Sequence, residues 1–270
     1  MLIPKKIEKE FIYSLILDDH KKFKEVILEN KLDYERILSI ISHNRIEYFV
    51  LNKLDNVLNL NELPINFLDK LKKNYFKKSI PTLKIIEKVF LLSEKLLESN
   101  IEHVFLKGIS LYEQNSIYMR PMRDIDILVN PEDILSIVDL AKSLNFKFKN
   151  KEVELSESYI NNLLFYDLPL MVDNSGVFLE IHYRITIGNE NCLLKDNLLE
   201  SKRIIKIHDK DLCLPSFSSL FMHLVYHGSK KGNFNAGLSV LTDLLFLHGR
   251  VKKNEVLRIS EPLELKKVSE

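Results

Sequence analysis

The sequence has few of the residues that cross-link or interrupt a chain. It contains only two cysteines, Cys192 and Cys213, which lie 21 residues apart without a CxxC pair. Two isolated thiols exclude a disulfide framework and a structural zinc site, and they are typical of a cytoplasmic protein with reduced cysteines. Seven glycines and eight prolines are scattered through 270 residues, so no flexible Gly/Pro-rich linker marks a domain boundary. Domain boundaries must therefore be inferred from changes in hydrophobic periodicity.

Long apolar runs and an excess of one charge are absent as well. The first ten residues mix lysines with glutamates, which disfavours a secretory signal, and no later run reaches the roughly 18 apolar residues of a transmembrane helix. We therefore expect a cytoplasmic protein without a membrane partner. The formal net charge is +1, from 39 basic and 38 acidic residues, which disfavours a broad nucleic-acid-binding surface. A local basic patch is compatible with this balance.

Apolar residues make up 46% of the chain, enough for a sizeable core. Residues 1–100 have the 3.6-residue period of successive helices, as in Phe23, Val26 and Ile27. The clearest of these helices has Ser79 and Pro81 as start signals and is predicted to end near Ser99. Its apolar stripe consists of Ile85, Val89, Leu92 and Leu96.

The pattern changes after residue 100. The short apolar run 103–106 predicts a buried strand, and the alternation in 124–129 predicts a second one. Asn130 and Pro131 are typical of a helix start. Segments 163–172 and 177–185 predict an antiparallel hairpin around the turn 173–176, and the chain beyond residue 190 is predicted to be helical. We therefore expect an α+β fold with a helical region 1–100, a small mixed-sheet core 101–188 and a helical region 189–270.

The candidate chemistry lies on the strand 124–129. Asp124 and Asp126 are two positions apart, so both carboxylates point to one face of the strand, with Cα atoms roughly 6 to 7 Å apart. Such a pair alone is weak evidence for a metal site, because roughly five acid-x-acid spacings are expected by chance in a chain of this composition. Glu180 supplies a third carboxylate if the hairpin folds beside this strand. Three carboxylates that share two divalent ions are typical of nucleotidyl transfer.

The residues around the carboxylates favour a phosphate-bearing substrate. Lys107 and Gly108 end the preceding strand, where a residue without Cβ lets backbone N–H groups approach a phosphate at the start of a helix. Ser110 adds a hydroxyl. Arg120 and Arg123 precede the carboxylates, and each is predicted either to contact phosphate oxygens or to pair with the acids structurally.

These segments carry a family resemblance. The motifs Phe105-Leu106-Lys107-Gly108, Arg123-Asp124-Ile125-Asp126 and Leu179-Glu180-Ile181-His182 resemble the uncharacterised nucleotidyltransferase family of the DNA polymerase β-like superfamily. The likeness extends to His43-Asn44-Arg45-Ile46 and to the helical C-terminal part. One departure is the turn Gly108-Ile109-Ser110, where many members of the superfamily have adjacent Gly and Ser.

The resemblance implies a polymerase β-like core with Asp124, Asp126 and Glu180 as metal ligands, and Lys107 and Gly108 at the nucleotide phosphates. It also implies two Mg²⁺ ions, with Mn²⁺ as a substitute, and an NTP as substrate. The acceptor would be a hydroxyl on a small molecule, an RNA or a protein, and the sequence leaves this choice open. The alternative hypothesis is a catalytically inactive nucleotide-binding or structural partner protein with the same fold.

Several polar residues are left with two interpretations. His182 shares the predicted face of Glu180, and it either contacts the substrate site or is an ordinary sheet histidine; the role of Arg184 is open. His223 and His227 have a metal-compatible spacing, but core or surface positions are favoured because no second ligand motif accompanies them. Asp243 lies in an apolar helical segment, which predicts a structural pair with an arginine.

Overall fold

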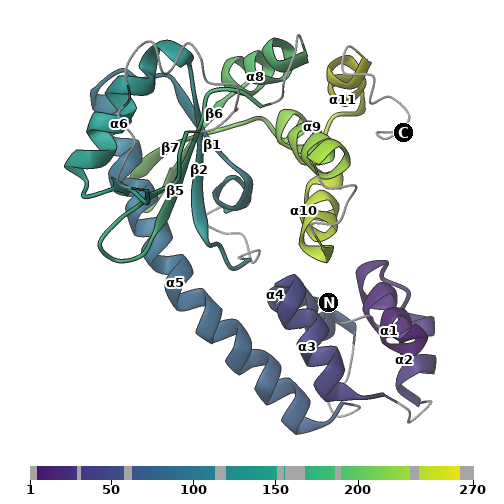
Figure 1. Cartoon of the computed structure of the whole chain (residues 1–270). Helices are drawn as coiled ribbons and strands as arrows, with labels where there is room; N and C mark the ends of the chain where they lie inside the picture. Colours follow the sequence, from purple (N-terminus) through teal and green to yellow (C-terminus); the bar gives the residue numbers. More distant parts are fainter. Residues whose placement is uncertain are drawn as a thin grey trace.

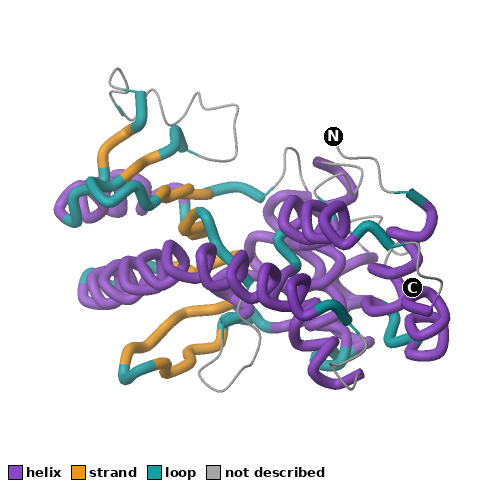
Figure 2. The backbone as a smooth tube through the Cα atoms, turned by 90° about the horizontal axis from the view of Figure 1, so that it is seen from below, coloured by secondary structure: helices purple, strands orange, loops and turns teal. Residues whose placement is uncertain are grey.

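The computed structural model describes residues 5–28, 32–57, 63–112, 120–150, 155, 168–185, 190–231 and 237–261. A mixed sheet lies at its centre with helices on both faces, and a long helix connects it to a group of N-terminal helices (Figure 1). Seen from below, the strands gather at one end of the molecule and both chain ends lie at the other, among helices (Figure 2). The predicted α+β class with a mixed sheet is confirmed.

The sheet has the strand order β1-β2-β5-β4-β3. Its strands are β1 (His103–Leu106), β2 (Asp124–Val129), β3 (Lys147–Phe148), β4 (Met171–Val172) and β5 (Phe178–His182). β2 and β5 are parallel, whereas the other neighbouring pairs are antiparallel. The first two strands have the predicted bounds.

The predicted hairpin is present as β4 and β5, but both strands are shorter than predicted, since residues 168–170 and 183–185 are not part of them. Its turn is held by Asp173, whose Oδ1 accepts the backbone N–H groups of Ser175 at 2.8 Å and Val177 at 2.9 Å. Lys88 forms an ion pair with the same carboxylate at 3.0 Å. Residues 163–167 of the predicted first strand lie outside the described residues. The turn therefore holds β4 beside β5.

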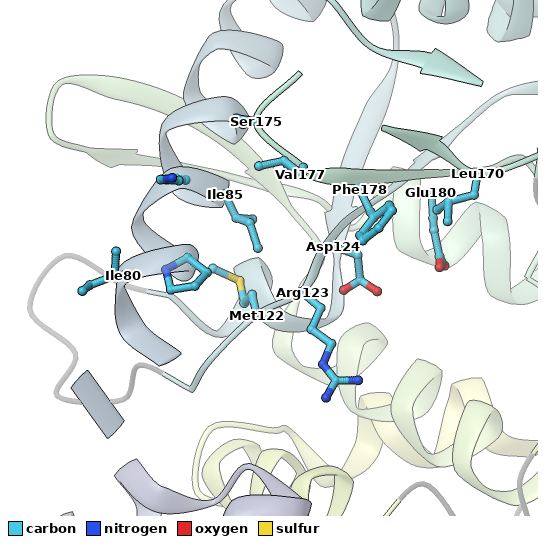
Figure 3. A pocket seen from close by; sticks show the side chains of 13 residues that line it. Ile80, Ile85, Met122, Arg123, Asp124, Leu170, Ser175, Val177, Phe178 and Glu180 are labelled. Atoms are coloured by element: carbon cyan, nitrogen blue, oxygen red, sulfur yellow. The ribbon is translucent and has the colours of Figure 1, made fainter. Parts of the chain in front are cut away.

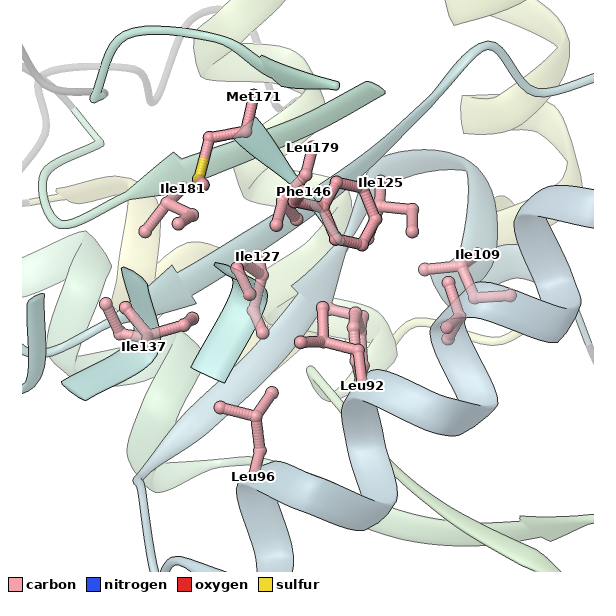
Figure 4. Packing of buried hydrophobic residues seen from close by; sticks show 14 of the residues in the cluster. Leu92, Leu96, Ile109, Ile125, Ile127, Ile137, Phe146, Met171, Leu179 and Ile181 are labelled. Carbon is pink, nitrogen blue, oxygen red and sulfur yellow. The ribbon is translucent and has the colours of Figure 1, made fainter. Parts of the chain in front are cut away.

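The main core lies on one face of the sheet, under α5 (Ile65–Glu98) and α6 (Ile134–Ser143). Ile125 and Ile127 of β2 point into it and are 0% exposed, together with residues of β5 and both helices (Figure 4). A short 3₁₀ helix, η3 (Pro131–Asp133), leads into α6. Asn130 precedes η3, but its side chain forms no cap and instead bonds Glu102 and Lys195.

The N-terminal helices form a second core of their own. They are α1 (Lys6–Ile16), α2 (His20–Leu28), α3 (Tyr34–Asn44) and α4 (Glu47–Val57). The predicted apolar positions Phe23, Val26 and Ile37 are buried in this cluster. Phe67 and Leu71, from the first half of α5, pack with them. The helical character predicted for this region is confirmed.

The predicted start of the last N-terminal helix is wrong. Instead of beginning near Ser79 and Pro81, α5 begins at Ile65 and passes through Pro81. Both halves of α5 are packed, the first against the N-terminal helices and the second against the sheet. This burial outweighs the hydrogen bond that proline removes from a helix interior.

The helical region predicted beyond residue 190 also contains a hairpin that was not predicted. Between α8 (Glu190–Glu200) and α9 (Phe217–Tyr226) the chain forms the antiparallel strands β6 (Arg203–Ile207) and β7 (Lys210–Leu214). Their turn consists of His208 and Asp209, which both have positive φ, at 47° and 60°. Such a turn usually carries glycine or Asn-Gly, so the usual sequence signal of a hairpin is absent.

Helices from the C-terminal part of the chain cover the other face of the sheet. η4 (His227–Lys231), α10 (Leu238–His248) and α11 (Lys253–Ser260) follow α9. Val104, Leu106 and Leu128 on that face pack with residues of α8, α9 and α11. No helix in the described ranges is both long and apolar enough to span a membrane. This face of the sheet also carries the acidic residues.

Candidate active site

The carboxylates meet where β2 and β5 run side by side. The register places Asp126 opposite Glu180 and Asp124 opposite Phe178. Because side chains alternate along a strand, Asp124, Asp126 and Glu180 all point to the face opposite the main core. β5 therefore lies beside β2, which is the arrangement that Glu180 needs to act as the third carboxylate.

Two basic side chains lie against these acids. Lys107 Nζ is 2.5 Å from Asp126 Oδ1 and 3.8 Å from Glu180 Oε2. His182, opposite Leu128 in the register, donates through Nε2 to Asp126 Oδ1 at 3.0 Å and lies 3.7 Å from Glu180 Oε2. Of the two interpretations of His182, the structure therefore favours the one that places it at the site.

The protonation equilibria differ between the acids. Burial raises the pKa of Asp124, and the nearby charge of Asp126 raises it further. Glu180 shows the same direction, because burial and the Asp126 charge raise its pKa. For Asp126, burial alone would raise the pKa, but the charge of Lys107 and the hydrogen bond from His182 outweigh burial and hold the pKa well below its usual range. Asp126 is therefore the anionic centre of the cluster.

The same residues have a geometry that suits a cation. One ligand atom from each of Asp126, Glu180 and His182 lies within 4.8 Å of the others. Carboxylate oxygens are the ligands of Mg²⁺ and Mn²⁺, and imidazole accompanies them in sites of transition metals. Asp124 is not part of this closest group. It lines the cavity that opens beside Glu180.

The turn after β1 shapes the neighbouring wall of the site. A 3₁₀ helix, η2 (Lys107–Leu111), begins at Lys107, which has a positive φ of 52°. A Cβ at Gly108 would lie 2.8 Å from Met122 Cγ, so any other residue here would require the Met122 side chain or the turn to shift. The Ser110 hydroxyl is fully buried and donates to the backbone carbonyl of Phe105. In this structure the Ser110 side chain holds the turn closed.

The two arginines before β2 have different surroundings. Arg120 Nε forms an ion pair with Asp243 Oδ2 at 2.9 Å, so the predicted arginine partner of Asp243 is found. Arg123 is surface-exposed and lines the cavity beside the carboxylates. Contact of either arginine with a phosphate stays a prediction.

A cavity of about 460 Å³ lies between the middle of α5, the β4–β5 turn and the acids. Figure 3 shows the carboxylates of Asp124 and Glu180 beside Phe178, with Ile80, Ile85 and Met122 across from them. Its lining residues are Ile80, Pro81, Lys84, Ile85, Met122, Arg123, Asp124, Leu170, Ser175, Gly176, Val177, Phe178 and Glu180. We call it the carboxylate cavity. Its volume and mostly apolar wall are typical of a small-molecule site.

The other polar candidates lie farther from the acids or are buried. His223 of α9 is 4% exposed, and burial lowers its pKa well below its usual value. Its ring lies 6.1 Å from that of His227, measured between centroids. No metal-ligand group within the described residues includes either histidine. The exposed Arg184 guanidinium lies over the Tyr183 ring at 5.6 Å.

Taken together, the fold and the site define a mixed α/β protein with a carboxylate cluster, of a geometry that suits a cation, beside a glycine turn. The family described as uncharacterised nucleotidyltransferase matches residues 30–268, and the chain belongs to this family. The resemblance inferred from the motifs is thereby confirmed. Family membership assigns the chain to nucleotidyl transfer in general.

Two solved structures are similar to this chain. The antibiotic-resistance factor ANT(2'')-Ia has 11% sequence identity and a TM-score of 0.48, with 68% of this chain and 95% of that chain covered. An antigenic nucleotidyltransferase-like protein from Paracoccidioides brasiliensis has 10% identity and a TM-score of 0.41, with 68% and 90% covered. No curated protein matches the sequence.

Proposed function

We propose that this protein transfers a nucleoside monophosphate from an NTP to a hydroxyl group of an acceptor, with release of pyrophosphate. The observation that carries the proposal is the β2–β5 register, which sets Asp126 opposite Glu180 with Asp124 two residues away. A substrate cavity opens directly beside Asp124 and Glu180. A binding or structural protein has no need for three carboxylates on one face of a sheet.

The acids would hold the divalent ions on which this chemistry depends. Asp126, with Asp124 and Glu180 beside it, supplies the oxygen ligands that Mg²⁺ or Mn²⁺ prefers. Two such ions, when bound, stabilise the attacking and leaving oxygens of an in-line phosphoryl displacement. The Asp126 and Glu180 carboxylates fit this role, because ligand atoms of both already lie close together with one of His182, and Asp124 lies two residues from Asp126 on the same strand.

The basic residues would then serve the nucleotide. Lys107 begins the turn next to Asp126, and we propose that its ammonium group turns toward the NTP phosphates when cations take its place at the acids. Gly108 keeps the turn close to Met122, and Ser110 holds that turn through its bond to Phe105. Arg123 is the arginine that we propose for a phosphate contact, since Arg120 is engaged by Asp243.

Glu180 is the proposed base for the acceptor hydroxyl. Its side chain is 31% exposed and lines the carboxylate cavity, so a hydroxyl group bound there can reach it. Burial and the charge of Asp126 raise its pKa, which makes the carboxylate a stronger proton acceptor than a free glutamate. Asp126, with its lowered pKa, is unsuited to this task and stays ionised as a ligand.

The test has a binding step and a turnover step. Calorimetric titration of NTP is expected to show binding that requires Mg²⁺ and that falls at least tenfold, about 1.4 kcal/mol, in Asp126→Asn. Incubation with each labelled NTP, Mg²⁺ and a cell lysate is then expected to give a labelled product that is missing with Asp124→Ala. Equal NTP affinity with and without Mg²⁺, and in both proteins, would refute the proposal. Metal-dependent binding without any product would instead favour the inactive partner protein.

A further inference from the structure

A second cavity, of about 360 Å³, adjoins the carboxylate cavity on the side of the N-terminal helices. It is lined by Ser42, Arg45, Asn74, Lys77, Lys78, Pro81, Pro121, Met122 and Arg123. The two cavities share Pro81, Met122 and Arg123. The two cavities therefore adjoin at these three residues, and we call the second one the basic cavity.

The basic cavity has positive charges without matching acids. No aspartate or glutamate is among its lining residues. Lys78 is neutralised, because its ammonium group bonds Glu47 and the Ser42 hydroxyl. For Arg45, Lys77 and Arg123, no carboxylate within the described parts of the chain comes within ion-pair distance, so three positive charges converge without compensation. Like charges held together lower the stability of the fold unless an anion joins them.

The placement of these cations depends on tertiary structure. Arg45 caps the end of α3 in a left-handed conformation with φ 56°. The preceding Asn44 fixes this end, because its amide donates to the Ile40 carbonyl at 2.8 Å and its oxygen accepts the Leu238 N–H at 3.0 Å. The end of α3 is thereby tied to α10, and Arg45 is held over the cavity. Such a position is pre-organised for a ligand.

The two cavities differ in the charges of their linings. Asp124 and Glu180 line the carboxylate cavity together with Lys84 and Arg123. The basic cavity shares Arg123 and adds Arg45 and Lys77, with the polar groups of Ser42 and Asn74. Guanidinium, ammonium, hydroxyl and amide donors around one space suit a group with several acceptor oxygens, as a phosphate has. A polycationic acceptor would be repelled there.

We infer that the acceptor carries a phosphate group that lies in the basic cavity while its reacting hydroxyl lies at Asp124 and Glu180. The inference rests on the proposed nucleotidyl transfer. The NTP phosphates are assigned to the Lys107–Gly108 turn, next to Asp126, and to Arg123 on the wall that the two cavities share, whereas Arg45 and Lys77 line the basic cavity alone and are left for the acceptor. A single-stranded RNA end and a phosphorylated small molecule share this chemistry, with a phosphate near a free hydroxyl.

A binding experiment tests the phosphate site directly. A short fluorescent oligouridylate with a free terminal hydroxyl is titrated with the protein, and glycerol phosphate or glycerol is added as competitor. Lys77→Glu is compared with Lys72→Glu, which changes the same charge at another exposed position of the same helix, outside both cavities. We expect Lys77→Glu to weaken binding of the phosphorylated probes about tenfold, and Lys72→Glu by less than about twofold.

The competitors identify the source of the phosphate. If glycerol phosphate displaces the oligouridylate and glycerol does not, the acceptor is a phosphorylated small molecule; if only the oligouridylate binds, it is an RNA end. Both results support the inference. Equal losses in the two lysine variants, or no binding of either phosphorylated probe, would overturn it. Arg45→Ala, a second variant at the same cavity, is expected to weaken binding with the same probe preference.

This outcome is separable from that of the proposed function. Lys77→Glu is expected to keep Mg²⁺-dependent NTP binding, whereas Asp126→Asn is expected to lose it and to keep oligouridylate binding. A parallel loss of NTP binding in Lys77→Glu would show that the basic cavity serves the NTP, against the inference. Absence of metal-dependent NTP binding in the unmodified protein would refute the proposed function and leave the phosphate-site result standing.

Discussion

Asp124 and Asp126 lie two residues apart on one strand, yet their surroundings differ. Asp126 is 3% exposed and bonds both Lys107 and His182. Asp124 is half-buried, and within the described chain no basic side chain forms an ion pair with it. One acid is therefore part of a closed polar cluster, and the other faces a cavity.

The difference shows how a site can be stable before its ligands arrive. The Asp126 side is satisfied by the protein's own cations, since Lys107 also lies 3.8 Å from Glu180. The Asp124 side has a carboxylate whose pKa is raised by burial and by the Asp126 charge, so its ionisation opposes folding. We infer that the first side maintains the geometry, whereas the second gains its favourable interactions only from substrate and metal.

The largest expected effect is a difference in the free energy of unfolding between variants of the two acids. In EDTA, Asp126→Asn is expected to destabilise the protein by about 3 kcal/mol, because Lys107 loses the partner of a buried ion pair. Asp124→Asn is expected to stabilise it by up to about 1 kcal/mol, because it removes an acid whose folded-state pKa is raised. Urea unfolding near neutral pH measures both.

The pH dependence checks the sign of the Asp124 effect. A raised folded-state pKa means that the ionised acid destabilises the fold above the unfolded-state pKa and that this cost vanishes as the acid becomes protonated at lower pH. The advantage of Asp124→Asn should therefore shrink as the pH falls. Equal destabilisation by both variants would remove the contrast between the two sides of the site.

Much of the acidic cluster could be predicted because its determinants are local. The alternation of Asp124 and Asp126 with isoleucines sets the face of β2, and the turn 173–176 sets the hairpin that brings Glu180 to it. His182 follows Glu180 at the same two-residue spacing, so the sequence predicts that it shares the face of Glu180. It does not predict whether His182 contacts the acids. The sequence could not tell which acid is paired, because Lys107 reaches Asp126 across 19 residues.

What the sequence did not reveal depends on contacts between distant segments. Pro81 predicts a helix start, but burial of both halves of α5 keeps the helix continuous. The β6–β7 hairpin was missed because His208 and Asp209 occupy turn positions that usually take glycine. The basic cavity joins Arg45 to Arg123 through packing of α3 against α5, which no single motif encodes.

The next effect concerns the wall between the two sides of the site. Gly108→Ala is expected to destabilise the protein by about 2 kcal/mol, since the added methyl group meets Met122 Cγ at 2.8 Å and Sδ at 3.0 Å. Because Met122 lines both cavities, nucleotide transfer should fall as well. Gly249→Ala is the control, as nothing lies within 4 Å of its added Cβ, and it should be neutral or slightly stabilising. If Gly108→Ala leaves the free energy of unfolding unchanged, the turn can accommodate a Cβ at this position.

The smallest effect tests how α5 holds the Asp124 side. The buried Thr82 hydroxyl accepts the Met122 N–H at 3.0 Å and donates to the Lys78 carbonyl at 3.1 Å, which ties the segment before Asp124 to α5. Thr82→Val keeps the shape and leaves the Met122 N–H without an acceptor, so a loss of about 1 kcal/mol is expected in urea unfolding. Ser79→Ala is the matched control, because that hydroxyl only donates to Tyr75 in its own helix, a bond that contributes little. If Thr82→Val lowers transfer while Ser79→Ala does not, the position of Asp124 depends on α5; equal rates in both variants would mean that β2 alone positions it.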